Sequence, residues 1–268
     1  MTDAPATSLA VGLLGADGRM GRAVVGVLAA APGAHLAAAF TQDGSPHLGR
    51  DAGEVAGVAA TGATLQPFNA DALAGCDVLI DFSTPDATRA AVLAMGVGSC
   101  QAIVTGTTGQ GEAELAELHD LARGLRFLRA GNFSLGVNLM AVLVEQAAKA
   151  LPGWDVELAE AHHRHKVDSP SGTAILLGEA AARGRGTGLT WENERAGERG
   201  PGIGLSVVRS GGIIGDHAVS FVSEHESLSL SHRALDRSLF AQGALEAARW
   251  LATQAPGLYG MRDVLGLE

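Results

Sequence analysis

The stretch LAVGLLGADGRMGRAVVGVLAA, residues 9–30, decides the fold of this chain. Its first six residues, Leu9–Leu14, form a short apolar run that predicts a buried strand. Glycines at positions 15, 18 and 21 follow, and a helical pattern covers Arg22–Ala31. A glycine-rich turn between a strand and a helix lets a pyrophosphate approach the backbone and rest on helix N–H groups. This context favours a dinucleotide-binding site. The GxxGxxG spacing differs from the usual GxGxxG, so an ordinary tight turn is the alternative.

Strands and helices alternate through the rest of the first half. Further strands are predicted at His35–Phe40, Asp77–Phe82, Ala102–Thr105 and Leu125–Leu128, with helices at Asp86–Met95 and Glu112–Arg123. This alternation is typical of a doubly wound parallel sheet, so the expected class is α/β with an N-terminal Rossmann-like sheet. The glycine-rich segment Gly44–Asn69 fits neither pattern clearly.

The pattern changes after Ser134, which caps a predicted amphipathic helix. The later elements are strands at Asp155–Ala161, Gly204–Arg209, Ile214–Val222 and Ser227–His232, helices at Thr173–Arg183 and Asp236–Thr253, and a polar loop over Gly184–Gly202. Three consecutive strands without helices between them indicate an antiparallel meander. We therefore expect a second α+β domain with an open, largely antiparallel or mixed sheet. A boundary near Asn132–Ser134 separates a dinucleotide-binding domain, 1–133, from a substrate-binding domain, 134–235.

The composition limits the class of protein. The chain has 268 residues and a net charge of -10, which argues against nucleic acid or an anionic membrane as a partner. Its two cysteines, Cys76 and Cys100, are too few for a disulfide framework or a cysteine-rich metal site. The first ten residues carry no basic cluster typical of a secretory signal, and no apolar run reaches the roughly 18 residues of a membrane span. We expect a cytoplasmic protein.

The end of the second strand bears on the choice of cofactor. An acid about 20 residues after the first glycine usually binds the ribose of NAD. Thr41 and Gln42 stand at that place. A 2′-phosphate could be tolerated there, with help from Arg19, but Asp43 could equally serve as the ribose acid. NADPH and NADH both remain open as the cofactor.

A hydroxyl-rich turn, Gly106-Thr107-Thr108-Gly109, follows the predicted strand Ala102–Thr105. The carboxyl end of a strand in an open parallel sheet faces the ligand crevice. We therefore expect this turn to approach the nicotinamide or the substrate, with an ordinary turn as the alternative.

The least random stretch is EAHHRHK, residues 160–166, which holds three of the nine histidines and one of only two lysines. Histidine transfers protons near neutral pH, and lysine is a titratable donor whereas arginine is not. Because the chain otherwise uses arginine, Lys166 indicates a task that arginine cannot perform. We interpret the stretch as an anion pocket with acid–base chemistry. A metal site through His162 and His165, and a merely solvated basic face, are the alternatives, and we expect no metal.

A predicted helix opens directly after this stretch, within DSPSGTA at 168–174. Pro170 and Ser171 are typical of helix entry. Backbone N–H groups at Gly172 and Thr173, together with the Thr173 hydroxyl, would bind a carboxylate, although plain capping explains the same residues. Two adjacent anion sites indicate a small dicarboxylate substrate.

These motifs resemble those of the 4-hydroxy-tetrahydrodipicolinate reductases, also called dihydrodipicolinate reductases. The matching stretches run from end to end in the family's order: GADGRMGR at 15–22, VTGTTG at 104–109, AGNFSLGVN at 130–138, EAHHRHKVDSPSGTA at 160–174 and MRDVLGL at 261–267. The stretch at 160–174 is the most specific of them.

The resemblance implies an activity and a set of roles. The activity is NAD(P)H-dependent reduction of 4-hydroxy-tetrahydrodipicolinate to tetrahydrodipicolinate, with loss of water, in the diaminopimelate route to lysine. His162 would be the proton donor or acceptor and Lys166 the proton donor. His163 would contact the substrate, and Gly172 and Thr173 would hold a substrate carboxylate. A homotetramer formed through the sheet of the second domain, and the return of residues 236–268 to the first domain, are also implied.

The resemblance also implies which residues bind the cofactor. They are Gly15, Ala16, Asp17, Gly18, Arg19, Met20, Thr41, Gln42, Gly106, Thr107, Thr108, Ala130, Gly131, Asn132 and Phe133. Family members often carry an acid, sometimes followed by Arg, where Thr41 and Gln42 stand, so the preference for NADH or NADPH does not carry over.

Two other functions fit parts of the pattern. One is another two-domain NAD(P) dehydrogenase, of the aspartate or homoserine type. The other is a non-catalytic nucleotide-binding sensor, which would keep the first domain but has no need for the EAHHRHK stretch.

Overall fold

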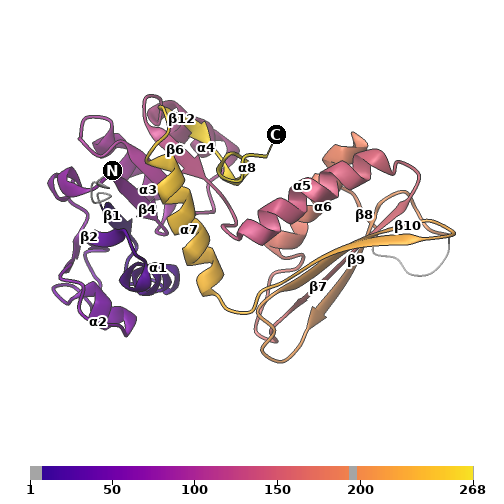
Figure 1. The fold of residues 1–268 in the computed structure, drawn as a ribbon, viewed down its shortest axis with the longest axis horizontal. Helices are drawn as coiled ribbons and strands as arrows, with labels where there is room; N and C mark the ends of the chain where they lie inside the picture. The colour runs from indigo at the N-terminus through magenta and orange to yellow at the C-terminus, as the bar shows by residue number, and fades with distance from the viewer. Residues whose placement is uncertain (1–7, 193–197, 268) are drawn as a thin grey trace, which may run out of the picture. The chain divides into compact units, whose positions relative to one another are not determined.

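The computed structural model describes residues 8–192 and 198–267. The chain forms two compact units, one made of residues 8–133 and 238–266 and the other of residues 134–237 (Figure 1). No helix within these described residues is long and apolar enough to cross a membrane.

A parallel sheet of seven strands forms the centre of the first unit. Its order is β12 (Gly257–Tyr259), β6 (Arg126–Arg129), β5 (Ala102–Thr105), β4 (Val78–Asp81), β1 (Leu9–Leu14), β2 (Ala34–Thr41) and β3 (Leu65–Pro67). The sheet's helices are α1 (Arg19–Ala30), α2 (Ala52–Ala56), α3 (Pro85–Met95), α4 (Glu112–Leu121), α7 (Ser238–Leu251) and α8 (Met261–Val264), with a 3-10 turn at Asp71–Gly75. Side chains from α3 and α4 pack on Leu79, Ile103 and Phe127 on one face, and α1 and α7 pack together against the other. The central strands are apolar because both faces are covered.

The structure confirms the predicted α/β class and refines the first unit. Helix α1 begins at Arg19 rather than Arg22, because Gly18 already takes the extended conformation of a helix cap. The ambiguous segment Gly44–Asn69 contains α2 and the short edge strand β3. On the opposite edge, β12 comes from near the end of the chain and pairs with β6.

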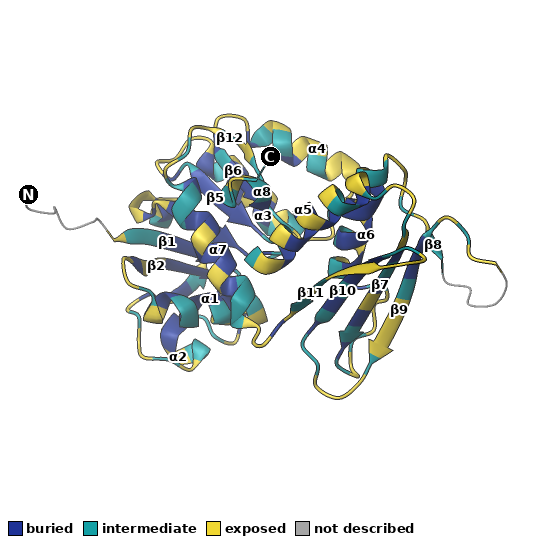
Figure 2. Cartoon of the chain, turned by 45° about the vertical axis from the view of Figure 1, so that its right-hand side comes forward, coloured by how far each residue is buried: buried dark blue, intermediate teal, exposed yellow. Residues whose placement is uncertain are grey.

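The second unit is a mixed sheet of five strands with two helices on one face (Figure 2). The order is β11 (Ser227–Arg233), β10 (Asp216–Val222), β7 (Asp155–His162), β9 (Ile203–Arg209) and β8 (Trp191–Glu192). Helices α5 (Leu135–Ala150) and α6 (Gly172–Arg185) pack against Leu158, Val219 and Phe221. Burial alternates along β7, because every second side chain faces the helices.

The predicted meander is wrong for one of its strands. β9 pairs with β7 in parallel, and β7 lies between β9 and β10, so only β10 and β11 form an antiparallel hairpin. Neighbours in sequence pair only as a tendency, and here the central place goes to β7, whose helix-facing residues are all buried. The predicted loop 184–202 contains the end of α6 and the short strand β8, and its residues 193–197 lie outside the described residues.

Candidate active site

A pocket opens in the first unit at the carboxyl ends of β1, β2 and β4. Its walls are Leu14, Gly15, Asp17, Gly18, Thr41, Gln42, Asp43, Pro67, Phe68, Phe82, Ser83, Thr84 and Ala87. The structure thus brings the first turn and the end of β2 together, as the sequence predicts for a dinucleotide site. The strand-end position of Thr41 is buried, whereas Gln42 and Asp43 are exposed.

The glycine turn packs too closely against neighbouring backbone to hold a side chain at its first position. Gly15 has a φ of +79°, and a Cβ there would lie 2.5 Å from the carbonyl oxygen of Phe82. Gly18 lines the pocket and caps α1 without any side-chain hydrogen bond, so no capping side chain occupies the first N–H groups of the helix. An uncapped helix start next to bare backbone suits a pyrophosphate. The residues present therefore fit a dinucleotide.

Asp17 links the glycine turn to the loop after β2. Its carboxylate accepts a hydrogen bond from the Ser45 hydroxyl, and Ser45 is buried. Burial alone would raise the pKa of Asp17, but the hydrogen bond from Ser45, together with the nearby hydroxyl of Thr41, outweighs it and lowers the pKa below its ordinary value. Asp17 therefore fixes the pocket wall as an ionised acceptor. No sequence signal marks Ser45.

Asp81, at the end of β4, gathers the loops on the same edge of the sheet. Its side chain is fully buried. Oδ2 accepts hydrogen bonds from the hydroxyls of Thr88 at 2.5 Å, Thr105 at 2.7 Å and Thr107 at 3.0 Å. Oδ1 accepts from the backbone N–H and the hydroxyl of Ser83. The predicted cofactor residue Thr107 thus uses its hydroxyl to hold the turn after β5 in place.

The remaining predicted cofactor residues do not line this pocket. Gly106 lies against the rings of Phe82 and Phe133, which stack edge to face with centroids 5.5 Å apart. Ala16 and Phe133 are buried. The others stand at the start of α1 or after β5 and β6: Arg19, Met20, Thr108, Ala130, Gly131 and Asn132.

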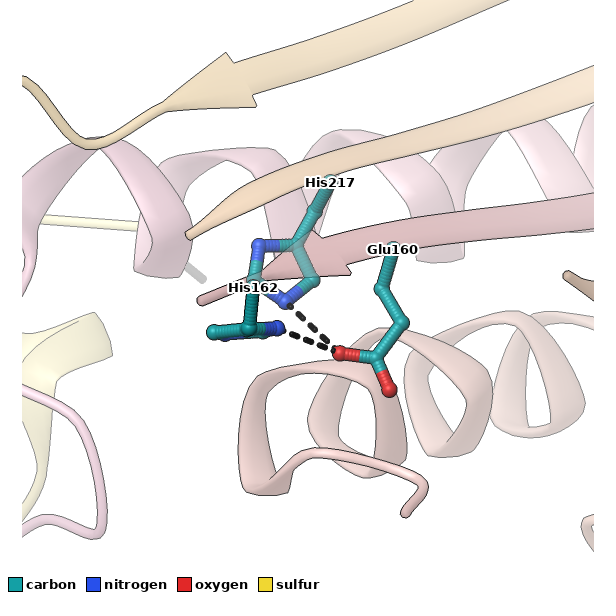
Figure 3. A group of neighbouring side chains, drawn as sticks. All are labelled: Glu160, His162 and His217. Carbon is teal, nitrogen blue, oxygen red and sulfur yellow. Dashed lines mark ion pairs between the residues drawn. The ribbon is translucent and has the colours of Figure 1, made fainter. Parts of the chain in front are cut away.

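In the second unit, two histidines converge on one buried glutamate (Figure 3). Oε2 of Glu160 lies 2.8 Å from Nδ1 of His162 and 3.9 Å from Nε2 of His217. The contact with His162 is an ion pair at hydrogen-bond length whose N–H is not aimed straight at the oxygen. The other oxygen, Oε1, accepts hydrogen bonds from the backbone of Ser171 at 3.0 Å and from Arg209 at 3.1 Å.

Burial and charge set the protonation of this cluster. Burial would raise the pKa of Glu160, but the hydrogen bonds from Ser171 and the cation of Arg209 lower it below its ordinary value. Burial lowers the pKa of His162, against the opposing carboxylate of Glu160. Burial, reinforced by His162, lowers the pKa of His217 to about 4. At neutral pH the cluster therefore holds an ionised Glu160 and a neutral His217.

The turn after β7 carries the remaining predicted groups. Lys166 Nζ lies 2.7 Å from Asp168 Oδ2, and this ion pair holds the pKa of Asp168 below its ordinary range. Desolvation, followed by the positive charge of Arg237, lowers the pKa of His163. His163 and Lys166 are both part-exposed, so they are accessible to a small anion.

Helix α6 begins where the sequence predicts a carboxylate site. Ser171 is its cap and accepts a hydrogen bond from the N–H of Ala174. Gly172 is exposed and Thr173 part-exposed at the first turn. No acidic side chain lies in that turn, so the helix start keeps its affinity for an anion.

The structure also offers three ligand atoms for a metal ion, though not the pair His162 and His165. Glu160, His162 and His217 place one such atom each within 4.8 Å of one another. The 2.8 Å between Glu160 and His162 is shorter than the ~3.3 Å between ligands of a tetrahedral zinc ion. Arg209 already supplies the positive charge on Glu160. This arrangement favours an ion-pair network, and the absence of a metal stays a prediction.

Sequence reasoning missed five groups in these two sites, of which Ser45, on the loop after β2, is one. Asp81 and Arg209 carry no motif, and His217 and Arg237 lie far along the chain from residues 160–166. Glu160 was within the quoted stretch but had no role. The period of two along a strand places it on the same face as His162, so that signal could have found it.

A Rossmann-type sheet with a glycine turn, together with a unit that carries a histidine–lysine cluster, defines a two-domain nicotinamide-nucleotide oxidoreductase. The family described as "Dihydrodipicolinate reductase, N-terminus" matches residues 9–133, and "Dihydrodipicolinate reductase, C-terminus" matches residues 136–265. The chain belongs to the dihydrodipicolinate reductase family.

Individual relatives agree with this assignment. The 4-hydroxy-tetrahydrodipicolinate reductase of Sinorhizobium medicae is 47% identical over 98% of this chain and 99% of its own length. That of Halorhodospira halophila is 45% identical over 97% of this chain and 100% of its own length. A solved structure, dipicolinate-bound dihydrodipicolinate reductase from Paenisporosarcina sp. TG-14, shares the fold with a TM-score of 0.76, at 24% identity, over 94% of this chain and 97% of that one.

Proposed function

We propose that this chain reduces 4-hydroxy-tetrahydrodipicolinate to tetrahydrodipicolinate and water with NADH or NADPH, in the diaminopimelate route to lysine. Membership of the family supports this reaction. The observation that carries it is the cluster of His162, Lys166 and the open start of α6, which together suit proton transfer to a small carboxylate-bearing substrate. Neither a sensor nor an aspartate- or homoserine-type dehydrogenase is supported by the relatives.

The first unit is proposed to bind the cofactor, which supplies a hydride when bound. The pyrophosphate would rest on Gly15, Asp17 and Gly18 at the start of α1, with the ribose near Thr41 and Gln42. Ala16, Arg19 and Met20 complete that turn. Gly106, Thr107, Thr108 and residues 130–133 would line the nicotinamide side, where Asp81 holds the turn after β5.

The second unit, residues 134–237, is proposed to bind the substrate and deliver a proton. Hydride addition to a conjugated C=N system builds electron density that a nearby acid must neutralise. His162 and Lys166 are the proposed proton-transferring groups. Gly172 and Thr173 would hold one carboxylate through N–H groups at the start of α6, and His163 would contact the substrate; these contacts would orient the ring. The relative solved with dipicolinate is consistent with a dicarboxylate ligand.

A homotetramer formed through the second unit's sheet is also proposed. The face of this sheet that α5 and α6 leave open carries a shallow pocket with small side chains, including Ala159, Ala161, Ser206 and Ala218. Small side chains allow a second sheet to pack closely. Molar mass by light scattering tests this assembly.

A cytoplasmic location accords with the free, buried thiols of Cys76 and Cys100.

The reaction is tested by mixing the purified chain with NADPH and enzymatically generated substrate, and by following the loss of NADPH absorbance. We expect substrate-dependent oxidation of NADPH, and none with aspartate semialdehyde. Cofactor binding without any substrate-dependent oxidation would overturn the proposal and favour a sensor. Turnover of aspartate semialdehyde alone would favour the other dehydrogenase class.

A further inference from the structure

The carboxylate of Glu160 is held from several elements of the second unit. Its side chain has no exposed surface. It contacts His162 on its own strand, Arg209 on β9 and the N–H of Ser171 at the start of α6. A buried charge is tolerated only when it is paired and hydrogen-bonded, so these contacts fix both the ionisation and the place of this group.

The ring of His162 is oriented between two different neighbours. Nδ1 faces Glu160, whereas Nε2 faces Gly215, where a Cβ would lie only 3.2 Å from that nitrogen. A carboxylate 2.8 Å from Nδ1 favours a proton on that nitrogen and leaves the other nitrogen to exchange one, because the second ring nitrogen is set by the environment of the first. We propose that Glu160 is a positioning residue, which keeps a proton on Nδ1 of His162 so that Nε2 is the atom that exchanges a proton with the substrate. This inference rests on the proposed function of His162.

The charges around His162 show why such a partner is needed. Burial lowers the pKa of His162, and the cations of Lys166 and Arg209 lower it further. His217, on β10, is neutral near pH 7 and gives no compensating charge. The carboxylate of Glu160 is the nearby group that opposes these effects. Without it, the imidazolium needed for proton donation would form only at lower pH.

Glu160 also connects the proton-transferring group with the anion-binding helix start. The N–H that its Oε1 binds belongs to Ser171, which directly precedes Gly172 and Thr173. The same carboxylate thus holds the end of β7 and the first turn of α6 in a fixed register. We infer that substrate orientation and proton delivery both depend on it.

The test is Glu160→Gln, which keeps the shape and removes the charge. We expect kcat to fall about 100-fold, while the KM for NADPH stays unchanged. The alkaline limb of the kcat–pH profile should move about one pH unit lower, because His162 loses its counter-ion. Glu179→Gln is the control, since Glu179 lies in the same unit, is exposed in the middle of α6 and has no role in the proposed site. It should leave kcat and the profile unchanged.

A double-mutant cycle separates positioning from a merely structural role. If Glu160 acts through His162, adding Glu160→Gln to His162→Gln should cost less than about threefold in kcat. A full 100-fold cost in that background, or a pH profile of Glu160→Gln identical to the wild type, would overturn the inference. If Glu160→Gln does not fold, Glu160→Asp is the second variant, because its shorter side chain keeps the carboxylate beside Arg209 and moves it away from His162. The same two outcomes, measured with this variant, would overturn the inference.

Failure of the inference and failure of the proposed function give different results. If the wild-type chain does not oxidise NADPH with the substrate, the proposed function itself is wrong. If it does, and His162→Gln is fully active, the role of His162 is wrong. If His162→Gln is impaired but Glu160→Gln matches the wild type, only the positioning role of Glu160 is wrong.

Discussion

Two buried carboxylates, one in each unit, are satisfied in opposite ways. Asp81 in the first unit is surrounded by hydroxyl and N–H donors that do not titrate near neutral pH. Glu160 in the second unit is surrounded by Arg209 and two histidines. Neutral donors hold a shape that does not depend on pH, whereas titratable partners make the same kind of carboxylate part of a proton-transfer network. The difference is consistent with the proposed division of roles, in which the first unit binds the cofactor and the second transfers a proton.

The largest effect is expected from the second unit, with Lys166→Ala. Turnover should fall about 1,000-fold, because the variant removes the proposed proton donor beside Asp168. NADPH binding should survive, since the proposed cofactor residues lie in the first unit. Steady-state kinetics and a fluorescence titration with NADPH measure the two quantities.

The chain offers a matched control for this variant. Lys149, the other lysine, is exposed in the last turn of α5, so Lys149→Ala should leave turnover unchanged. Full activity of Lys166→Ala would contradict the role of Lys166. Loss of NADPH binding in that variant would contradict the proposal that the first unit binds the cofactor and the second unit transfers the proton.

A stability effect comes next, from Asp81→Asn in the first unit. The amide cannot accept from all the donors around it, so the free energy of unfolding should fall by about 3–4 kcal/mol. NADPH binding should weaken as the Thr107 turn loosens. Urea unfolding at pH 6 and pH 8 measures the loss. Asp86→Asn, at an exposed position in the first turn of α3, is the control. If the loss of unfolding free energy differed strongly between pH 6 and pH 8, the proposed contrast between the pH-independent Asp81 network and the Glu160 cluster would be wrong.

Local patterns account for what could be predicted from the sequence. Periodicity and glycine placement are properties of neighbouring residues, so β1, α1 and the alternation after them were predictable, as was the density of His and Lys at 160–166. Strand pairing is not local. Arg209 reaches Glu160 because β9 pairs with β7, and His217 reaches it because β10 pairs with β7 on the other side. The short strands β8 and β12 exist only through such pairing.

The next effect concerns the acid stability of the second unit. Burial and the nearby positive charges of His162 and His232 lower the pKa of His217 to about 4, against the opposing carboxylates of Glu160 and Asp216. Between pH 6.5 and about pH 4, the unfolded chain, with a histidine pKa near 6.5, therefore binds a proton at His217 that the folded chain does not bind. Stability should be fully present above about pH 6.5 and fall by up to about 3 kcal/mol as the pH drops toward 4.

Denaturant unfolding across that pH range measures the acid effect. His217→Gln removes the titrating group and should flatten the pH dependence, although its stability at pH 7 will also change. Equal steepness in the variant and the wild type would show that other groups titrate.

The smallest effect tests how the first unit recognises its cofactor. Its strand-end position holds Thr41 and Gln42 instead of an acid, so repulsion of a 2′-phosphate at that position is absent, and Asp43 lines the pocket just beyond. The ratio of kcat/KM for NADPH and NADH should lie within about tenfold, or 1.4 kcal/mol. Gln42→Glu should restore the repulsion and shift the ratio toward NADH. If the wild type already strongly prefers NADH, Asp43 acts as the ribose acid, and Asp43→Asn should then relax the preference. That result would make the charge of Asp43 the determinant of cofactor choice in the first unit.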